Sequence, residues 1–122
     1  HRNLNIRRIG YVASEITKNR GAAICAPIAP YEESRNYVKD IISQYGEYIL
    51  VHVSTSLAVC EKRDTKGLYK KAKQGIIKGL TGVDDPYESP KNADLVIDTD
   101  GISVSDAVKD IMIYLKKNNL IS

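Results

Sequence analysis

The chain has 122 residues, enough for one small domain, and its 43% apolar and 27% charged residues are typical of a globular protein in water. No apolar run approaches the roughly 18 residues of a membrane span, and no signal-peptide pattern is present, so no membrane partner is expected. The net charge of +3 is uneven, because residues 1–20 carry +4 and residues 61–82 carry +5; this predicts an anionic ligand or, alternatively, solvated basic helix faces.

The first part of the chain predicts two helices and a strand. Apolar residues at helical spacing predict a helix over residues 3–19. The short apolar run Ala22–Ala26 predicts a buried strand, which Pro27 stops. A second helix is expected to open at Tyr31 and to close at Gly46, with an inner face formed by Val38, Ile41 and Ile42.

The second part continues the alternation. The β-branched run Tyr48–Val53 predicts a strand that is apolar on both faces, and Ser56–Arg63 predicts a short helix. A third strand is expected at Asp94–Asp98 and a last helix at Ser103–Lys117, where Ser103 and Asp106 form a capping-box-like start. This order predicts an α/β fold with a parallel sheet and right-handed crossovers. Three strands are few for such a sheet, so we expect one or two further strands to precede residue 1.

The two cysteines, Cys25 and Cys60, stand beside apolar residues in elements that are expected to be buried. Neither has a C-x-x-C partner, so we interpret both as reduced core thiols, with a disulfide or a reactive thiol as the alternative. Reduced thiols favour a cytoplasmic location. His52 is interpreted as a packed histidine of its strand, and no spacing predicts a metal site.

Residues 64–82, called the basic segment below, combine lysines with four glycines at positions 67, 75, 79 and 82. Each glycine disfavours a helix by about 1 kcal/mol relative to alanine, so the segment is expected to be hinged. A flexible cationic arm is typical of the lids that phosphoryl-transfer enzymes close over phosphates. A mobile basic loop without a ligand is the alternative.

Four runs of residues together carry a family resemblance. They are Arg2-Asn3-Leu4-Asn5-Ile6-Arg7-Arg8, Ala26-Pro27-Ile28-Ala29-Pro30-Tyr31, Cys60-Glu61-x-Arg63-Asp64, and Lys66-Gly67-Leu68-Tyr69-Lys70-Lys71-Ala72 followed by Asp85-Pro86-Tyr87-Glu88-x-Pro90. In this order they resemble adenylylsulfate kinase (APS kinase), and most closely the kinase domains fused to ATP sulfurylase. The resemblance covers essentially the whole chain.

The resemblance implies a P-loop nucleoside-kinase-like, three-layer α/β fold with a parallel sheet. It implies one partial domain over residues 1–122, with a lid at about residues 64–82. The implied activity is the ATP-dependent 3′-phosphorylation of adenosine 5′-phosphosulfate (APS) to PAPS in sulfate assimilation, with Mg²⁺ as the companion of ATP. The implied partners are APS, PAPS, ATP and ADP, a fused ATP sulfurylase domain and further copies of the chain, without nucleic acid or membrane.

The resemblance also assigns roles to individual residues. Arg63 is expected near the base of ATP. The residues expected to contact APS are Arg2, Asn5, Ile28, Ala29, Lys66, Gly79 and Leu80. Arg2 and Asn5 are spaced i and i+3, which places them on one helix face, and an arginine fork matches phosphate oxygens.

Three departures from the family pattern limit these assignments. The chain contains no Gly-Lys dipeptide, so it lacks the G-x-x-x-x-G-K-[ST] loop, and by itself it is expected to be inactive. Ala26 replaces the serine of the family turn, which leaves no identified catalytic residue, and no metal ligand is assigned. Leu80 replaces a lid phenylalanine, which costs about 1 kcal/mol of stacking on adenine.

These departures keep a second hypothesis open, in which the domain binds PAPS or APS without catalysis, as a regulatory module of ATP sulfurylase. A third hypothesis is nucleic-acid binding by the basic segments. The sequence offers neither a helix suited to reading base edges nor an aromatic platform for stacking bases in its support. Binding of a nucleotide sulfate is therefore the expectation that the first two hypotheses share.

Overall fold

The computed structural model describes residues 1–122, which divide into two compact units. The first unit comprises residues 1–48 and 86–90, and the second comprises residues 49–85 and 91–122. None of the helices combines the length and apolar character that crossing a bilayer requires.

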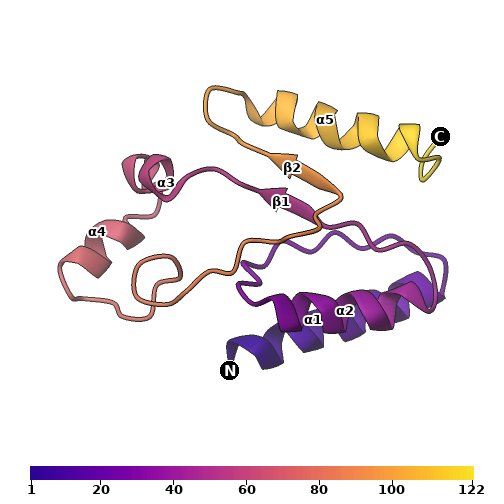
Figure 1. Ribbon diagram of the computed structural model, residues 1–122, viewed down its shortest axis with the longest axis horizontal. Coiled ribbons are helices and arrows are strands. Elements are labelled where there is room, and N and C mark those ends of the chain that lie inside the picture. Colours follow the sequence, from indigo (N-terminus) through magenta and orange to yellow (C-terminus); the bar gives the residue numbers. More distant parts are fainter. The chain divides into compact units, whose positions relative to one another are not determined.

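The first unit is built on the pairing of α1 (Arg2–Lys18) with α2 (Glu32–Ser43), which pack against each other (Figure 1). Gly10 allows a close approach of the two helices, because a Cβ at this position would lie 2.5 Å from Cγ2 of Val38. The buried apolar side chains of this unit are Ile6, Ala13 and Ile42. Both helices predicted for this part of the sequence are confirmed, with ends within a few residues of the expected ones.

The strand predicted at Ala22–Ala26 is wrong. The structure has no strand between α1 and α2, and residues 22–26 are all exposed, with Ile24 fully so. A strand exists only where a neighbouring backbone completes its hydrogen bonds, and in this structure the segment has no such neighbour. Cys25 is consequently exposed instead of buried, whereas Cys60 is half-buried; both thiols are free, so neither forms a disulfide.

The second unit contains a two-stranded parallel sheet, formed by β1 (Val51–Val53) and β2 (Leu95–Ile97), which run side by side in Figure 1. In its register, Val51 faces Leu95 and Val53 faces Ile97. The predicted parallel arrangement is confirmed, although the sheet has two strands instead of three. Ile97 is buried here, at 5% exposed, whereas Val53 and Val96 remain 60% and 59% exposed.

Three helices complete the second unit: α3 (Leu57–Arg63), α4 (Leu68–Lys73) and α5 (Val104–Lys117), the last of which contacts β2. The hydroxyl of Ser103 caps α5 by accepting a hydrogen bond of 3.0 Å from the Asp106 N–H, as the sequence predicted. Ser56 caps α3 in the same way through the Val59 N–H, at 3.3 Å.

Candidate functional site

Two threonines meet where the parallel strands end. Thr55 follows β1 and Thr99 follows β2, and their hydroxyl oxygens lie 2.6 Å apart. The backbone N–H of Thr99 also donates to Oγ1 of Thr55 at 3.0 Å, and the Ser54 N–H extends the ladder by donating to the Ile97 carbonyl. Ligands of open α/β sheets bind beyond the carboxyl ends of the strands, so this edge is the place to look for a nucleotide.

Arg63, the last residue of α3, reaches this edge. Its Nη1 donates to Oγ1 of Thr99 and its Nη2 to the Thr99 carbonyl oxygen, both at 2.8 Å. Two parallel bonds to one residue fix the plane of the guanidinium group, which leaves its flat face oriented for stacking. Arg63 is expected near the ATP base from the family resemblance, whereas Thr55 and Thr99 were not predicted from the sequence. Their position directly after two parallel strands is the signal that identifies them.

The basic segment begins with a compact turn at Asp64, which has a left-handed backbone (φ 29°, ψ 48°). The Asp64 carboxylate accepts two bonds of 3.0 Å, from the N–H groups of Tyr69 and Lys70 in the first turn of α4. Asp64 therefore fixes the start of α4, with Gly67 (φ 65°) as its left-handed N-cap. All four glycines of the segment have positive φ, so they form turns.

The lysines of the basic segment differ in their surroundings. Lys73 forms an ion pair of 3.0 Å with Glu61, and both side chains are at least partly exposed. Lys66 is exposed, and no carboxylate lies within ion-pair distance of it. The family resemblance implies that Lys66 contacts the phosphosulfate of APS, and its ammonium group retains all three donors for an anion.

Gly79 and Leu80, both expected at APS, lie in a closed loop at the end of the basic segment. The Leu80 carbonyl accepts bonds from the N–H groups of Val83, Asp84 and Asp85, at 2.9–3.3 Å. The Leu80 N–H is bonded in turn to Oδ2 of Asp84 at 3.2 Å. Because the backbone of Leu80 is saturated by its own loop, only its half-buried side chain is available to a ligand.

Tyr69 ties α4 to the end of α3. Burial raises the pKa of its phenol above the ordinary 10.0, and the nearby Cys60, Glu61 and Asp64 add to the rise. The phenol is thus held in its neutral form among acidic groups.

In the first unit, Arg2 and Asn5 are exposed on the first turns of α1, one helical turn apart as the sequence predicted. Ile28 is 64% exposed, and Ala29 has a left-handed backbone (φ 43°) although it carries a side chain and precedes Pro30. Both features oppose this conformation, because Cβ crowds the carbonyl and proline restricts its predecessor to extended backbone.

The turn at Ala29 is held by a buried arginine, Arg35, which was not predicted from the sequence. The Arg35 side chain is 5% exposed, and its Nη1 donates to the Ala29 carbonyl at 2.7 Å. Its Nη2 is bonded to Oε2 of Glu32 at 2.5 Å and to the Glu88 carbonyl at 2.7 Å. An arginine that follows a proline turn by five residues was the available signal, but its partner at position 88 cannot be read from local sequence.

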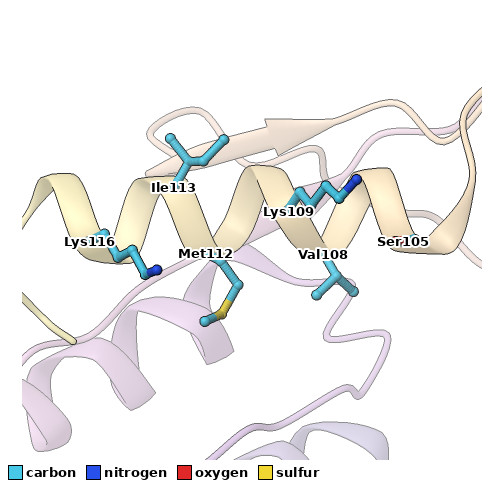
Figure 2. Close-up of a pocket in the computed structure, with 6 residues that line it drawn as sticks. All are labelled: Ser105, Val108, Lys109, Met112, Ile113 and Lys116. Atoms are coloured by element: carbon cyan, nitrogen blue, oxygen red, sulfur yellow. The ribbon is translucent and has the colours of Figure 1, made fainter. Parts of the chain in front are cut away.

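Two further observations limit the chemistry. Ala26 is exposed and has no nucleophilic group, and no cluster of three or more His, Cys, Asp or Glu side chains is arranged to hold a metal ion. The hollow drawn in Figure 2 is a surface feature of α5 alone, lined by Ser105, Val108, Lys109, Met112, Ile113 and Lys116. None of the residues expected to contact APS or ATP lines this hollow.

Comparison with known proteins adds a family. Residues 1–98 match the family described as Adenylylsulphate kinase. Among curated relatives, the sulfate adenylyltransferase of Aspergillus oryzae is 53% identical over 94% of this chain and 20% of its own length. That of Chaetomium globosum is 49% identical over 98% of this chain and 21% of its own length. The chain thus spans about a fifth of these relatives.

Solved structures of APS kinases also align with this chain. The Mycobacterium tuberculosis APS kinase CysC, in complex with AMPPNP and APS, aligns with a TM-score of 0.87 and 33% identity, over 94% of this chain and 66% of that one. A hexameric APS kinase from Thiobacillus denitrificans aligns with a TM-score of 0.72 and 37% identity, over all of this chain and 19% of that one.

Proposed function

Since this chain belongs to the adenylylsulphate kinase family and has its α/β, P-loop kinase-like fold, we propose that it forms the APS-binding part of an APS kinase domain. In the intact protein this domain transfers the terminal phosphoryl group of ATP to the 3′-hydroxyl of APS and yields PAPS. The observation that carries the proposal is the likeness in fold to an APS kinase that was solved with APS and AMPPNP.

The roles of the residues follow from their chemistry. Lys66 supplies an unpaired cation to the phosphosulfate, and Arg2 and Asn5 supply donors from one face of α1. The main chain at Ile28 and Ala29 lines the APS site, and Gly79 with the Leu80 side chain borders the adenine of APS. The basic segment acts as a lid that neutralises charge and excludes water when it closes.

The fit to ATP is partial. Arg63, oriented by Thr99, suits stacking on the base of ATP. No residue of this chain forms the Gly-Lys loop that cradles the β- and γ-phosphates or the hydroxyl ligand of Mg²⁺. When bound, ATP would supply the phosphoryl group and Mg²⁺ would neutralise its charge. The binding site for the ATP phosphates would have to come from a longer parent protein.

A second candidate function is the binding of PAPS or APS as a regulatory signal, without phosphoryl transfer. It is supported by the relatives' description as sulfate adenylyltransferases and by their higher identity, 49–53% against 33–37% for the solved kinases. Ala26 and Leu80 also favour it. In this candidate, the chain is fused to an ATP sulfurylase that it regulates, and the fused subunits associate into an oligomer.

One pair of measurements on the intact parent protein distinguishes the two functions. The first is ATP-dependent formation of PAPS from APS, and the second is calorimetric titration with APS and with PAPS. Turnover supports the kinase. Binding of PAPS without turnover, together with a change in ATP sulfurylase activity, supports the regulatory module. If neither nucleotide binds, both candidates are wrong.

A further inference from the structure

Unit 1 contains a polar network, centred on the buried Arg35, that joins two segments far apart in the sequence. One segment is the turn at Ala29 and Pro30, and the other is residues 86–90, which follow the basic segment. The Glu88 N–H donates to the Pro30 carbonyl at 2.8 Å. In return, Oε2 of Glu88 accepts a bond of 2.7 Å from the Glu32 N–H at the start of α2.

Arg35 completes the network from α2. Its two terminal nitrogens reach the carbonyls of Ala29 and Glu88, both at 2.7 Å, so one guanidinium group bridges the turn and the returning segment. The charge is balanced by Glu32, whose carboxylate lies 2.5 Å from Nη2. The Arg35 side chain is 5% exposed, and an arginine is rarely this buried unless its hydrogen bonds are needed.

The Ala29 turn, to which Arg35 is hydrogen-bonded, has a strained backbone. Ala29 has φ 43°, in the left-handed region that a residue with a Cβ avoids, and the following Pro30 disfavours it further. Such a conformation persists only where the surroundings impose it, and it is typical of sites that bind ligands. The bond from Nη1 to the Ala29 carbonyl is the contact that imposes it here.

We infer that Arg35 and Glu88 are positioning residues for the nucleotide sulfate: they hold the strained Ala29 turn in its ligand-binding conformation and anchor residues 86–90 to that turn. The inference rests on the proposed function, in which the main chain at Ile28 and Ala29 lines the APS site. Neither Arg35 nor Glu88 needs to touch the ligand; each acts through the backbone that it holds.

The test measures APS affinity in the intact parent protein by calorimetry, for Arg35→Lys and Glu88→Gln. Arg35→Lys keeps the positive charge but loses the two-pronged guanidinium group. Glu88→Gln keeps the shape of the side chain but loses its negative charge. Each variant is expected to weaken APS binding by about tenfold. The matched control is Glu33→Gln, also in α2, which removes the exposed pair between Glu33 and Arg7 of α1 and should change the affinity by less than about twofold. Wild-type affinity in both network variants overturns the inference.

A second substitution separates positioning from fold stability. Glycine adopts a left-handed backbone without strain, so Ala29→Gly should restore APS affinity in the Arg35→Lys background by about fivefold. In the wild-type background it should have little effect, because Arg35 already holds the turn. If Ala29→Gly restores nothing, Arg35 stabilises the fold without positioning the turn, and the inference is wrong.

A readout without ligand keeps this inference separate from the proposed function. Amide hydrogen exchange at Glu32 and Glu88 should accelerate by about tenfold or more in Arg35→Lys, while the amides of α5 in the other unit exchange as before. If the wild-type protein binds neither APS nor PAPS, the proposed function fails, and the exchange rates alone decide whether the network holds the turn. Unchanged exchange at both amides overturns the network.

Discussion

The guanidinium group of Arg63 grips Thr99 at two points, with Nη1 on its hydroxyl and Nη2 on its carbonyl, each at 2.8 Å. The same hydroxyl lies 2.6 Å from that of Thr55, so one threonine links the ends of both parallel strands to the last residue of α3. The arginine that precedes the basic segment is therefore fixed to the sheet, and the segment starts from a rigid point.

This arrangement predicts that Thr99→Ala destabilises the protein by about 1–2 kcal/mol, because two hydrogen bonds lose their shared hydroxyl. Thr99→Ser keeps the hydroxyl and should cost less than about 0.5 kcal/mol. Urea unfolding of both variants and of Arg63→Ala measures the effect. In a double-mutant cycle, Thr99→Ala and Arg63→Ala should couple by about 1 kcal/mol, and strict additivity would show that the two residues do not cooperate.

Gly67 provides a prediction about the start of α4. A Cβ at this position would meet nothing within 4 Å, so the cost of Gly67→Ala is purely conformational, about 1 kcal/mol at its φ of 65°. Gly67→Asn should cost less, since asparagine tolerates this backbone and caps helices. Hydrogen exchange of the Tyr69 and Lys70 amides reports the loss. Equal protection in Gly67→Ala and the wild type would mean that the left-handed turn does not hold α4.

Tyr69 predicts a change at alkaline pH. Its pKa lies above the ordinary 10.0, chiefly because of burial, so the folded protein holds the phenol proton more tightly than the unfolded chain does. The resulting stability is complete below pH 10.0 and is lost as the pH rises through the folded-state pKa. Stability measured against pH in this alkaline range should fall less steeply in Tyr69→Phe. The exposed Tyr11→Phe serves as the control, and an identical slope in all three proteins would contradict the assignment.

Lys66 predicts a selective loss of ligand affinity. Its ammonium group is unpaired in the structure, and a charge-assisted bond to a phosphosulfate contributes about 1.5–3 kcal/mol. Lys66→Ala in the intact parent should therefore weaken APS or PAPS binding by about tenfold or more, with a smaller salt dependence, and should leave the unfolding free energy nearly unchanged. Lys109→Ala on α5 is the matched control, and calorimetry at two salt concentrations is the measurement.

The sequence predicts those parts of this protein that local chemistry determines. The cap of α5 at Ser103, the spacing of Arg2 and Asn5 on α1, and the parallel sheet were all predicted from neighbouring residues or from the alternation of elements. The apolar run Ala22–Ala26 misled the prediction, because a strand depends on a partner that composition does not reveal.

The remaining features depend on contacts between distant residues. Arg35 meets the Glu88 carbonyl 53 positions away, and Arg63 meets Thr99 36 positions away. Neither pair leaves a periodic signal in the sequence. The carboxylate of Asp64 is a more local feature, since aspartate tolerates left-handed turns and lies close to the helix that it caps. Interpreting residues 64–67 as a turn would have predicted that Asp64 caps the following helix.

Titration of the intact parent protein with PAPS and with APS tests the central claim most directly. We expect saturable binding of at least one nucleotide sulfate at one site per chain, weakened by about tenfold or more in Lys66→Ala and unaffected in Lys109→Ala. If the folded wild-type protein gives only heats of dilution with both nucleotides, no binding occurs. This result would contradict the claim that this chain binds a nucleotide sulfate.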